Sequence, residues 1–222
     1  MIDQLIIGTN ASYDDFEASV KERKVHKPKK KSIKETVPFS NVTYDFTAIN
    51  GEIYWGETTL EYVFETTANT PEELEEKKQL FTSWIMNVMN AELHDPFIHG
   101  YHFNATFDSI GIDDSEIEKS TITVTFTAYP YMISNTKKSY SIGMETEEET
   151  TVKIMNDSSH RITPTFIADV PFYLIDKDLT YTFPAGETTV EEIIFGVGEN
   201  MLKVKAKNTA GMLRIEFYEE VF

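Results

Sequence analysis

The segment from Thr121 to Ala128 alternates without exception between threonine and an apolar residue. Successive side chains of a β-strand point to opposite faces, so this pattern places the apolar residues on one buried face and the threonines on the other. Threonine and the β-branched apolar residues also favour extended backbone. Such a segment is typical of an antiparallel sheet that packs one face on a core and leaves the other solvated.

The same kind of pattern recurs along the chain and predicts a mainly β protein. Leu60, Tyr62 and Phe64 alternate with Glu61, Val63 and Glu65, and apolar and polar residues alternate over Tyr101–Phe107. Short apolar runs separated by turn residues then continue through the C-terminal third, which predicts further strands. Their ranges are 152–155, 164–168, 172–175, 179–183, 189–195, 201–206 and 212–218.

One segment has the periodicity of a helix. Thr70 is a suitable N-cap, Pro71 suits the first helical position, and Glu73 completes a capping box. The apolar residues that follow recur at helical spacing, at Leu74, Phe81, Trp84, Ile85, Val88 and Met89. The sequence therefore predicts a helix over residues 71–89.

We expect two domains of a mainly β (α+β) fold. Residues 1–140 form a β-rich N-terminal domain with the helix and an extended hairpin. Residues 141–150 are acidic and have no apolar period, which predicts a linker. Residues 151–222 contain seven short strands at a spacing typical of a β-sandwich. With 41% hydrophobic residues, the chain can form a packed core in each domain.

Charge is divided unevenly along the chain. Residues 21–34 contain eight Lys or Arg and one Glu; from totals of 20 basic and 37 acidic residues, the rest of the chain has 12 basic and 36 acidic side chains. Because so acidic a chain repels nucleic acid over most of its surface, we do not expect a general DNA- or RNA-binding protein. The sequence begins without a signal-peptide pattern, and no run reaches the about 18 apolar residues of a membrane span. We therefore expect a protein made in a cytoplasm that does not bind a membrane.

The basic run has three interpretations. It could contact nucleic acid, although it contains no aromatic residue that would stack on a base. It could be a solvated loop, or the tip of a long hairpin around Pro28. It could also be an arm that binds the acidic surface of a second copy, because head-to-tail contacts between complementary surfaces close into rings. For this third interpretation the candidate contact residues are Lys21, Arg23, Lys24, Lys27, Lys29, Lys30 and Lys31.

No motif in the sequence indicates catalysis. Cysteine is absent, which excludes disulfides, thiolate metal sites and a cysteine nucleophile. The sequence has no G-x-S-x-G elbow and no P-loop. Gly196-Val197-Gly198 has only the first two glycines of a dinucleotide fingerprint, and it joins two predicted strands. We expect no enzyme, no catalytic residue and no cofactor.

The densest group of potential metal ligands is formed by His94, His99 and His102. Pro96 and Gly100 interrupt this segment, so it cannot present two histidines one turn apart on a helix. If a strand begins just before His102, that side chain points to the polar face and His99 lies in the turn. We interpret the segment as a solvated turn that enters a strand, and we expect no metal site.

The threonine face of residues 121–127 has two interpretations. It is either the ordinary solvent-facing side of a sheet, or a hydroxyl-rich surface that interacts weakly with what passes it. A surface of the second kind would suit the lining of a channel.

The order of these parts resembles a known family. In the N-terminal half, a Lys-rich hairpin precedes Val37–Phe46, Tyr54 and the strand Leu60–Phe64, followed by a capped helix with Trp84 and a strand pair ending in Thr125-Phe126-Thr127-Ala128-Tyr129-Pro130-Tyr131. In the C-terminal half the corresponding segments are Val152–Asn156, Pro164–Phe166 and Gly198–Leu202. Over nearly the whole chain, this order resembles the distal tail proteins (Dit) of siphophages, the long-tailed, non-contractile bacteriophages. The chain departs from the family pattern at Pro38-Phe39, where many relatives have Pro-Gly, and near Thr58-Thr59, where many have an arginine.

The resemblance implies a fold and a structural function in the virion. The implied fold is a tail-tube-like β-sandwich with one helix and an extended hairpin, followed by a galectin-like or jelly-roll β-sandwich. The N-terminal domains would form a hexameric ring, the distal tail hub, that joins the tail tube to the tail tip or baseplate and leaves a channel for DNA without binding it specifically. The implied partners are further copies of the chain, the tail tube protein, a tail-tip or tail-associated protein and receptor-binding proteins. The implied location is the tail tip of a phage or prophage virion, assembled in the cytoplasm of a host bacterium.

The alternative function is a carbohydrate-binding module that acts in adhesion to the host surface. Such a module would lie in the C-terminal sandwich and would need exposed aromatic rings to stack on sugars. The candidates are Phe172, Tyr173, Tyr181 and Tyr218. Both tryptophans, Trp55 and Trp84, lie in the other domain, which counts against this alternative.

Overall fold

The computed structural model describes residues 3–36, 39, 41, 43–48, 53–114, 116, 118–176 and 179–222. Val37, Pro38, Ser40 and Val42 of the segment that resembles the distal tail proteins lie outside the described residues. The chain divides into two compact units, Met1–Met132 and Ile133–Phe222, and each unit has its own hydrophobic core. No helix among the described residues combines the length and the apolar character needed to cross a membrane.

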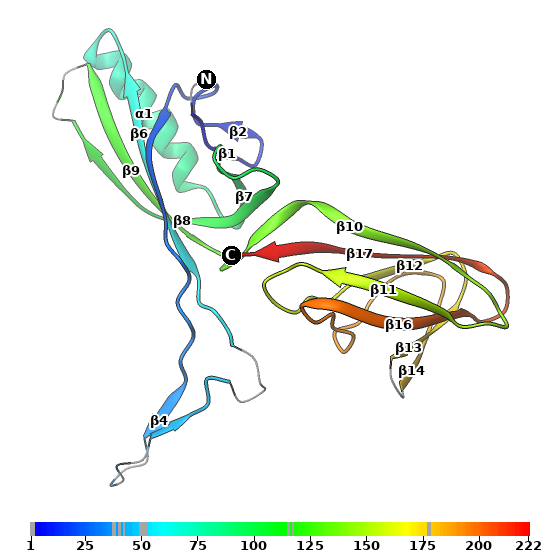
Figure 1. The fold of residues 1–222 in the computed structure, drawn as a ribbon. Helices are drawn as coiled ribbons and strands as arrows, with labels where there is room; N and C mark the ends of the chain where they lie inside the picture. Colours follow the sequence, from blue (N-terminus) through cyan, green and yellow to red (C-terminus); the bar gives the residue numbers. More distant parts are fainter. Residues whose placement is uncertain are drawn as a thin grey trace. The chain divides into compact units, whose positions relative to one another are not determined.

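The first unit is built on one antiparallel sheet (Figure 1). The strands of this sheet lie in the order β2-β1-β7-β8-β9-β6-β3, and β4 pairs with β5 in a separate two-stranded sheet. The elements are β1 (Ile6–Ile7), β2 (Asn10–Ala11), β3 (Ser19–Val25), β4 (Lys34–Thr36), β5 (Thr43–Asp45), β6 (Thr58–Thr67), α1 (Pro71–Met86), β7 (Ala91–His94), β8 (Tyr101–Asp113) and β9 (Lys119–Ala128).

Strand β9 has the alternation that its sequence predicts. Along the strand, partly exposed residues alternate with buried ones from Lys119 to Ala128. It lies between β6 and β8. β6 is longer than the predicted strand 60–65 at both ends, and β8 is longer than the predicted strand 101–107 at its C-terminal end. Its apolar face therefore enters the core of the first unit, and its threonine face stays accessible.

Helix α1 begins where the capping box predicts. The Thr70 Oγ1 accepts a hydrogen bond from the Glu73 backbone N–H at 3.2 Å. Leu74, Phe81 and Ile85 are buried, and the Phe81 ring lies 4.9 Å from that of Phe64 on β6. These contacts attach the helix to the apolar side of the sheet through the aromatic core.

The helix ends at Met86, three residues before the predicted end. Asn87 caps it, and its N–H bonds to carbonyls of the last turn. Asn90 then adopts a left-handed conformation, with φ of 47°. Val88 is buried and Met89 is exposed, but both residues follow the end of the helix. They are apolar residues of the segment that leads from α1 to β7.

The second unit is a pair of facing antiparallel sheets. One sheet has the order β15-β12-β17-β10 and the other β11-β16-β13-β14. The elements are β10 (Met132–Met144), β11 (Thr150–Asn156), β12 (Thr165–Ala168), β13 (Phe172–Asp176), β14 (Leu179–Phe183), β15 (Gly186–Thr189), β16 (Gly198–Ala206) and β17 (Gly211–Val221). Phe166, Phe172 and Phe183 stack between the sheets, with ring centroids 5.0 to 6.3 Å apart. The predicted strand at 189–195 is replaced by the short β15, after which Ile193 and Phe195 enter the core from a loop.

The boundary between the units differs from the predicted domain limits of 140 and 150. The division falls after Met132, and residues 133–144 form most of β10. Ile142 and Met144 are buried in the second core, which explains why this polar segment is a strand of the second unit. Residues 145–149 alone connect β10 to β11.

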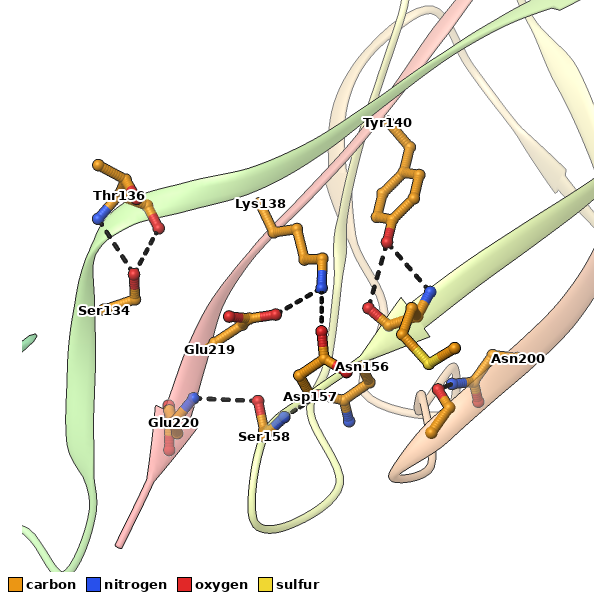
Figure 2. A network of polar contacts seen from close by, with 12 residues as sticks. Ser134, Thr136, Lys138, Tyr140, Asn156, Asp157, Ser158, Asn200, Glu219 and Glu220 are labelled. Atoms are coloured by element: carbon orange, nitrogen blue, oxygen red, sulfur yellow. Dashed lines mark hydrogen bonds and ion pairs between the residues drawn. The ribbon is translucent and has the colours of Figure 1, made fainter. Parts of the chain in front are cut away.

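A polar network fixes β10 to the rest of the second unit (Figure 2). The Lys138 ammonium lies 2.7 Å from Asp157 and 2.6 Å from Glu219. The Tyr140 hydroxyl donates to the Met155 carbonyl and accepts from its N–H. Burial alone would lower the pKa of Lys138, but the hydrogen bonds to the two carboxylates hold it above its ordinary value. Lys138 therefore stays charged and bridges β17 to the turn after β11.

The expected mainly β fold with a single helix is confirmed. The galectin-like character of the second unit stays a prediction.

Candidate functional site: the basic arm and the threonine face

The basic run forms one side of a two-stranded arm that continues from β3 and β6 (Figure 1). The Gly56 N–H bonds to the Lys29 carbonyl at 2.8 Å, and the Lys31 N–H bonds to the Tyr54 carbonyl at 2.8 Å. Beyond these contacts β4 pairs with β5. Pro28 lies along one side of the arm, so the interpretation that it marks the tip is wrong: the chain stays paired past it.

The seven predicted contact residues fall into two groups. Lys21 and Arg23 lie on β3 and each is ion-paired to a carboxylate of the first unit. The other five are exposed, and the described residues give none of them an ion pair within 4 Å. These five, which we call the arm lysines, are Lys24, Lys27, Lys29, Lys30 and Lys31.

Arg23 contacts a buried carboxylate at the start of the arm. Its Nη1 lies 2.6 Å from the Asp95 Oδ1, and the Asp95 side chain is fully buried. The Tyr62 hydroxyl donates to the Asp95 Oδ2 at 2.8 Å, and the Phe97 N–H donates to its Oδ1 at 2.8 Å. The guanidinium also lies over the Phe97 ring, 4.8 Å from its centroid. Arg23 therefore stabilises the fold of the first unit, and its contact with a partner stays a prediction.

Burial has a strong effect on Tyr62. Loss of solvation, followed by the nearby charge of Asp95, raises the pKa of this tyrosine far above its ordinary value. Tyr62 therefore keeps its proton at neutral pH and donates its hydrogen bond to Asp95.

Lys21 belongs to a second ion-paired group. Glu65 on β6 lies 2.7 Å from Lys119 and 2.8 Å from Lys21. Hydrogen bonds to Lys119 and then to Lys21 lower the pKa of Glu65. This group lies beside the threonine face, where the two lysines neutralise the negative charge of Glu65.

The structure adds aromatic residues to the arm that the basic run itself does not contain. The return side of the arm places Tyr54 beside Lys31 and Trp55 opposite Lys30. Tyr44 and Phe46 stack on each other at 6.3 Å near β5, and both are exposed. The sequence alone does not show that these aromatic residues are exposed, because Tyr44 and Phe46 alternate with Thr43, Asp45 and Thr47 as in a half-buried strand.

The threonine face is continuous across the centre of the sheet. In the β6/β9 register Glu61 and Val63 lie opposite Thr125 and Thr123, and in the β8/β9 register Ser109 lies opposite Thr125. Residues directly opposite in an antiparallel pair share a face. This face thus carries mainly hydroxyl and acidic side chains, together with the apolar Val63 and, at the edge opposite Glu61, Lys24.

The structure brings together part of the histidine segment. His94 on β7 and His102 on β8 have ring centroids 5.3 Å apart, and Glu92 lies within 4.8 Å of both at its ligand atom. His99 lies in the exposed turn, as predicted. Glu92 could not be identified from the sequence, because its proximity to the histidines depends on the pairing of β7 with β8.

Of the four aromatic residues proposed for sugar stacking, Tyr218 is exposed and the other three are buried or partly buried. Phe172 is fully buried, and Tyr181 is partly buried against Phe183. Lysine ammonium groups lie over the rings of Tyr173 and Tyr218. A cavity of about 630 Å³ in the second unit is lined in part by Arg161, Glu199 and Asn200, and by none of these four aromatic residues. Tyr218 also lines a second cavity, of about 440 Å³, so the carbohydrate-binding alternative stays a prediction.

Comparison with solved structures shows which fold this chain has. No protein-family model and no curated protein matches the sequence. Among solved structures, the Dit protein of phage SPP1 has 10% sequence identity and a TM-score of 0.70, with 98% of this chain and 99% of that chain covered. Its structure is described as a paradigm of the hub adsorption apparatus in phages that infect Gram-positive bacteria. A chain of the phage P2 baseplate, in its activated conformation with Ca, has 10% sequence identity, with 97% of this chain and 98% of that chain covered. Its TM-score of 0.44 is too low to show a common fold. The chain therefore has the fold of the SPP1 distal tail protein along nearly its whole length.

Proposed function

We propose that this chain is the structural hub at the distal end of a phage tail. The observation that carries the proposal is the likeness to the SPP1 Dit protein, because it extends over 98% of the chain and includes both units. A likeness confined to one sandwich would be compatible with many functions, since folds of this kind serve unrelated ones. The match of two successive units in the same order supports a common function.

The arm is the proposed contact between neighbouring copies in a ring. It combines the exposed arm lysines with exposed aromatic side chains, which is the composition of a surface that binds a complementary, partly acidic one. Outside residues 21–34, acidic residues exceed basic ones by 36 to 12, so each copy offers acidic surface to the arm of the next. Such head-to-tail contacts close into a ring when the rotation between copies allows it.

The threonine face is the proposed lining of the channel. Among the described residues of β6, β8 and β9 this face offers mainly hydroxyls and carboxylates, and a single arm lysine, Lys24, lies at its edge. It has no row of free cations for the phosphates of DNA, which dominate the affinity of most DNA-binding surfaces. A channel lined in this way would let DNA pass without holding it.

The proposed partners follow from this position in the tail. The ring would join the tail tube protein on one side and a tail-tip or tail-associated protein on the other, with receptor-binding proteins attached further out. In this proposal the chain is part of the virion tail tip and its contribution is structural, with no reaction catalysed.

The experiment that tests the ring is the native mass of the full chain by light scattering over a range of concentrations. Six copies of 25.5 kDa have a mass of about 153 kDa. Replacing Lys29, Lys30 and Lys31 with glutamine should shift the protein toward the monomer, more strongly at low salt, where the proposed charge contacts matter most. A monomer at every concentration and salt would contradict self-assembly of the ring.

A matched control separates the arm from charge in general. Replacing Lys153, Lys203 and Lys207 with glutamine removes the same charge from the second unit and should leave the ring mass unchanged. If the arm variant keeps the mass of the unmodified protein, docking through the arm is refuted and the hub function has to rest on other contacts.

A further inference from the structure

The hairpin formed by β7 and β8 places two histidines and a glutamate on one face of the sheet. The register pairs Glu92 with Asn104 and Leu93 with Phe103, so the next position pairs His94 with His102. Glu92 and His94 are two residues apart on β7 and therefore share a face. Leu93, between them, points into the core and is fully buried.

The backbone that carries these residues is held from both sides. β7 pairs with β8 on one side and with β1 on the other, where Ile6 lies opposite His94. The Gly8 N–H also bonds to the Glu92 carbonyl at 2.9 Å. The three side chains are thus carried by a fixed scaffold, as a preorganised ligand site requires.

Their ligand atoms already converge. One donor atom from each of the three residues lies within 4.8 Å of the other two, and His94 Nε2 lies 3.6 Å from a Glu92 oxygen. Bonds of about 2.0–2.1 Å to a tetrahedral ion place donor atoms about 3.3 Å apart. The largest movement needed is therefore about 1.5 Å. The Glu92 side chain is exposed and that of His94 is partly exposed, so both have room to rotate toward the buried His102.

We propose that Glu92, His94 and His102 bind a divalent transition-metal ion of the zinc class. Two imidazoles and a carboxylate are a ligand set that suits Zn²⁺, Co²⁺, Ni²⁺ or Cu²⁺, whereas Ca²⁺ and Mg²⁺ prefer oxygen ligands alone. Among the residues that the structure describes, this is the only group of three such side chains that converges in this way. The bound ion would link β7 to β8 and leave a coordination position for water.

The test is a calorimetric titration of the full chain, prepared without a histidine tag and stripped of metal, with ZnCl₂. One ion should bind per chain and raise the melting temperature, because a ligand that binds only the folded state stabilises it. CaCl₂ at the same concentration should do neither. Addition of Co²⁺ should give the visible absorption of a site with nitrogen and oxygen ligands.

Two variants and a matched control identify the ligands. His94→Ala should weaken Zn²⁺ binding by at least about tenfold, since even partners outside the ligand set change metal affinity by about 10–100-fold. Glu92→Gln should weaken it less but measurably. The control is His160→Ala, which removes another histidine that lies 2.7 Å from a carboxylate, that of Glu220, and should bind Zn²⁺ as the unmodified protein does.

Several results would overturn the proposal. One is the absence of Zn²⁺ binding by the unmodified chain, and another is equal stabilisation by Ca²⁺, which would indicate a site of carboxylates. Unchanged Zn²⁺ affinity in either His94→Ala or Glu92→Gln would also refute this set of ligands. Circular dichroism of each variant in EDTA checks that its fold is intact, and His94 and Glu92 are accessible enough for the substitutions to be tolerated.

Discussion

Arg23 was predicted from the sequence to bind a partner, but its contacts predict a different effect of mutation. Replacing Arg23 with alanine should destabilise the first unit, because its guanidinium neutralises the fully buried carboxylate of Asp95. Replacing the next residue, Lys24, should change little. Lys24 is exposed and has only Glu61 opposite it across the β3/β6 pair.

The contacts of Asp95 set the size of the effect. The carboxylate accepts hydrogen bonds from Arg23, from the Tyr62 hydroxyl and from the Phe97 N–H, so the substitution leaves it two of three donors. Removing one partner of a buried ion pair costs about 3–5 kcal/mol, and losing a hydrogen bond to a charged group costs about 1.5–3 kcal/mol. The Arg23 side chain is 34% exposed, so in the alanine variant water can solvate part of the Asp95 carboxylate. The cost should therefore fall in the range for a lost hydrogen bond to a charged group rather than in that for a broken buried ion pair. We expect Arg23→Ala to lower the free energy of unfolding by about 2–3 kcal/mol and Lys24→Ala by less than about 0.5 kcal/mol.

The assay is urea unfolding followed by tryptophan fluorescence. Both tryptophans of the chain, Trp55 and Trp84, lie in the first unit, so the signal reports that unit alone. Trp84 stacks on Phe16 at 4.5 Å and will change its emission when the core opens. Measurements belong at a protein concentration where light scattering shows a monomer, because self-assembly would add to the apparent stability.

A double-mutant cycle with Asp95→Asn isolates the pair. The loss caused by Arg23→Ala should shrink by at least about 1 kcal/mol when the charge on residue 95 is already absent. Equal losses in both backgrounds, or an Arg23→Ala protein as stable as Lys24→Ala, would refute the assignment of Arg23 to the fold.

Three further predictions concern single contacts of the first unit. Tyr62→Phe should lower the free energy of unfolding by about 1.5–3 kcal/mol in the same urea assay, because the charged Asp95 loses a buried donor. Glu65→Gln should be less stable than the unmodified chain at neutral pH, and the difference should vanish as pH falls. The sign follows from the lowered pKa of Glu65: its contribution is present above the unfolded value of 4.5 and is lost below it, which urea unfolding at a series of pH values measures. Thr70→Ala should lower stability by about 1 kcal/mol, because the Glu73 N–H loses its cap, whereas Thr70→Ser should keep it.

Sequence patterns predicted correctly those elements that depend only on interactions between residues close in the sequence. The alternation over 121–128 and the cap at Thr70 specify a strand and a helix start by themselves, since one face or one hydrogen bond decides each. The end of the helix was predicted less well. Val88 lies beyond the helix and is buried in the core of the first unit, so its apolar character extended the predicted helical period too far.

Features that depend on distant pairing could not be predicted. Ser134–Ser139 is polar and was assigned to the N-terminal domain, yet it is part of β10 because this strand completes a sheet of the second unit. In the sequence Arg23 is one of eight basic residues of the run 21–34, and nothing distinguishes it. Only the fold brings the buried Asp95 next to it. Glu92 joins the two histidines only through the register of β7 and β8, which the intervening Pro96 and Gly100 do not specify.

The strand order of the second unit has a consequence for synthesis on the ribosome. Strand β17 lies between β12 and β10, so the last strand of this unit to be translated pairs directly with the first. Leu213, Ile215 and Phe217 of β17 belong to its core, and without them the sandwich lacks the centre of one sheet. The first unit, in contrast, is complete once residue 132 has left the exit tunnel. The nascent chain should therefore fold in two separate steps, with the second delayed until β17 has emerged and the strands made before it left open to aggregation or to chaperones.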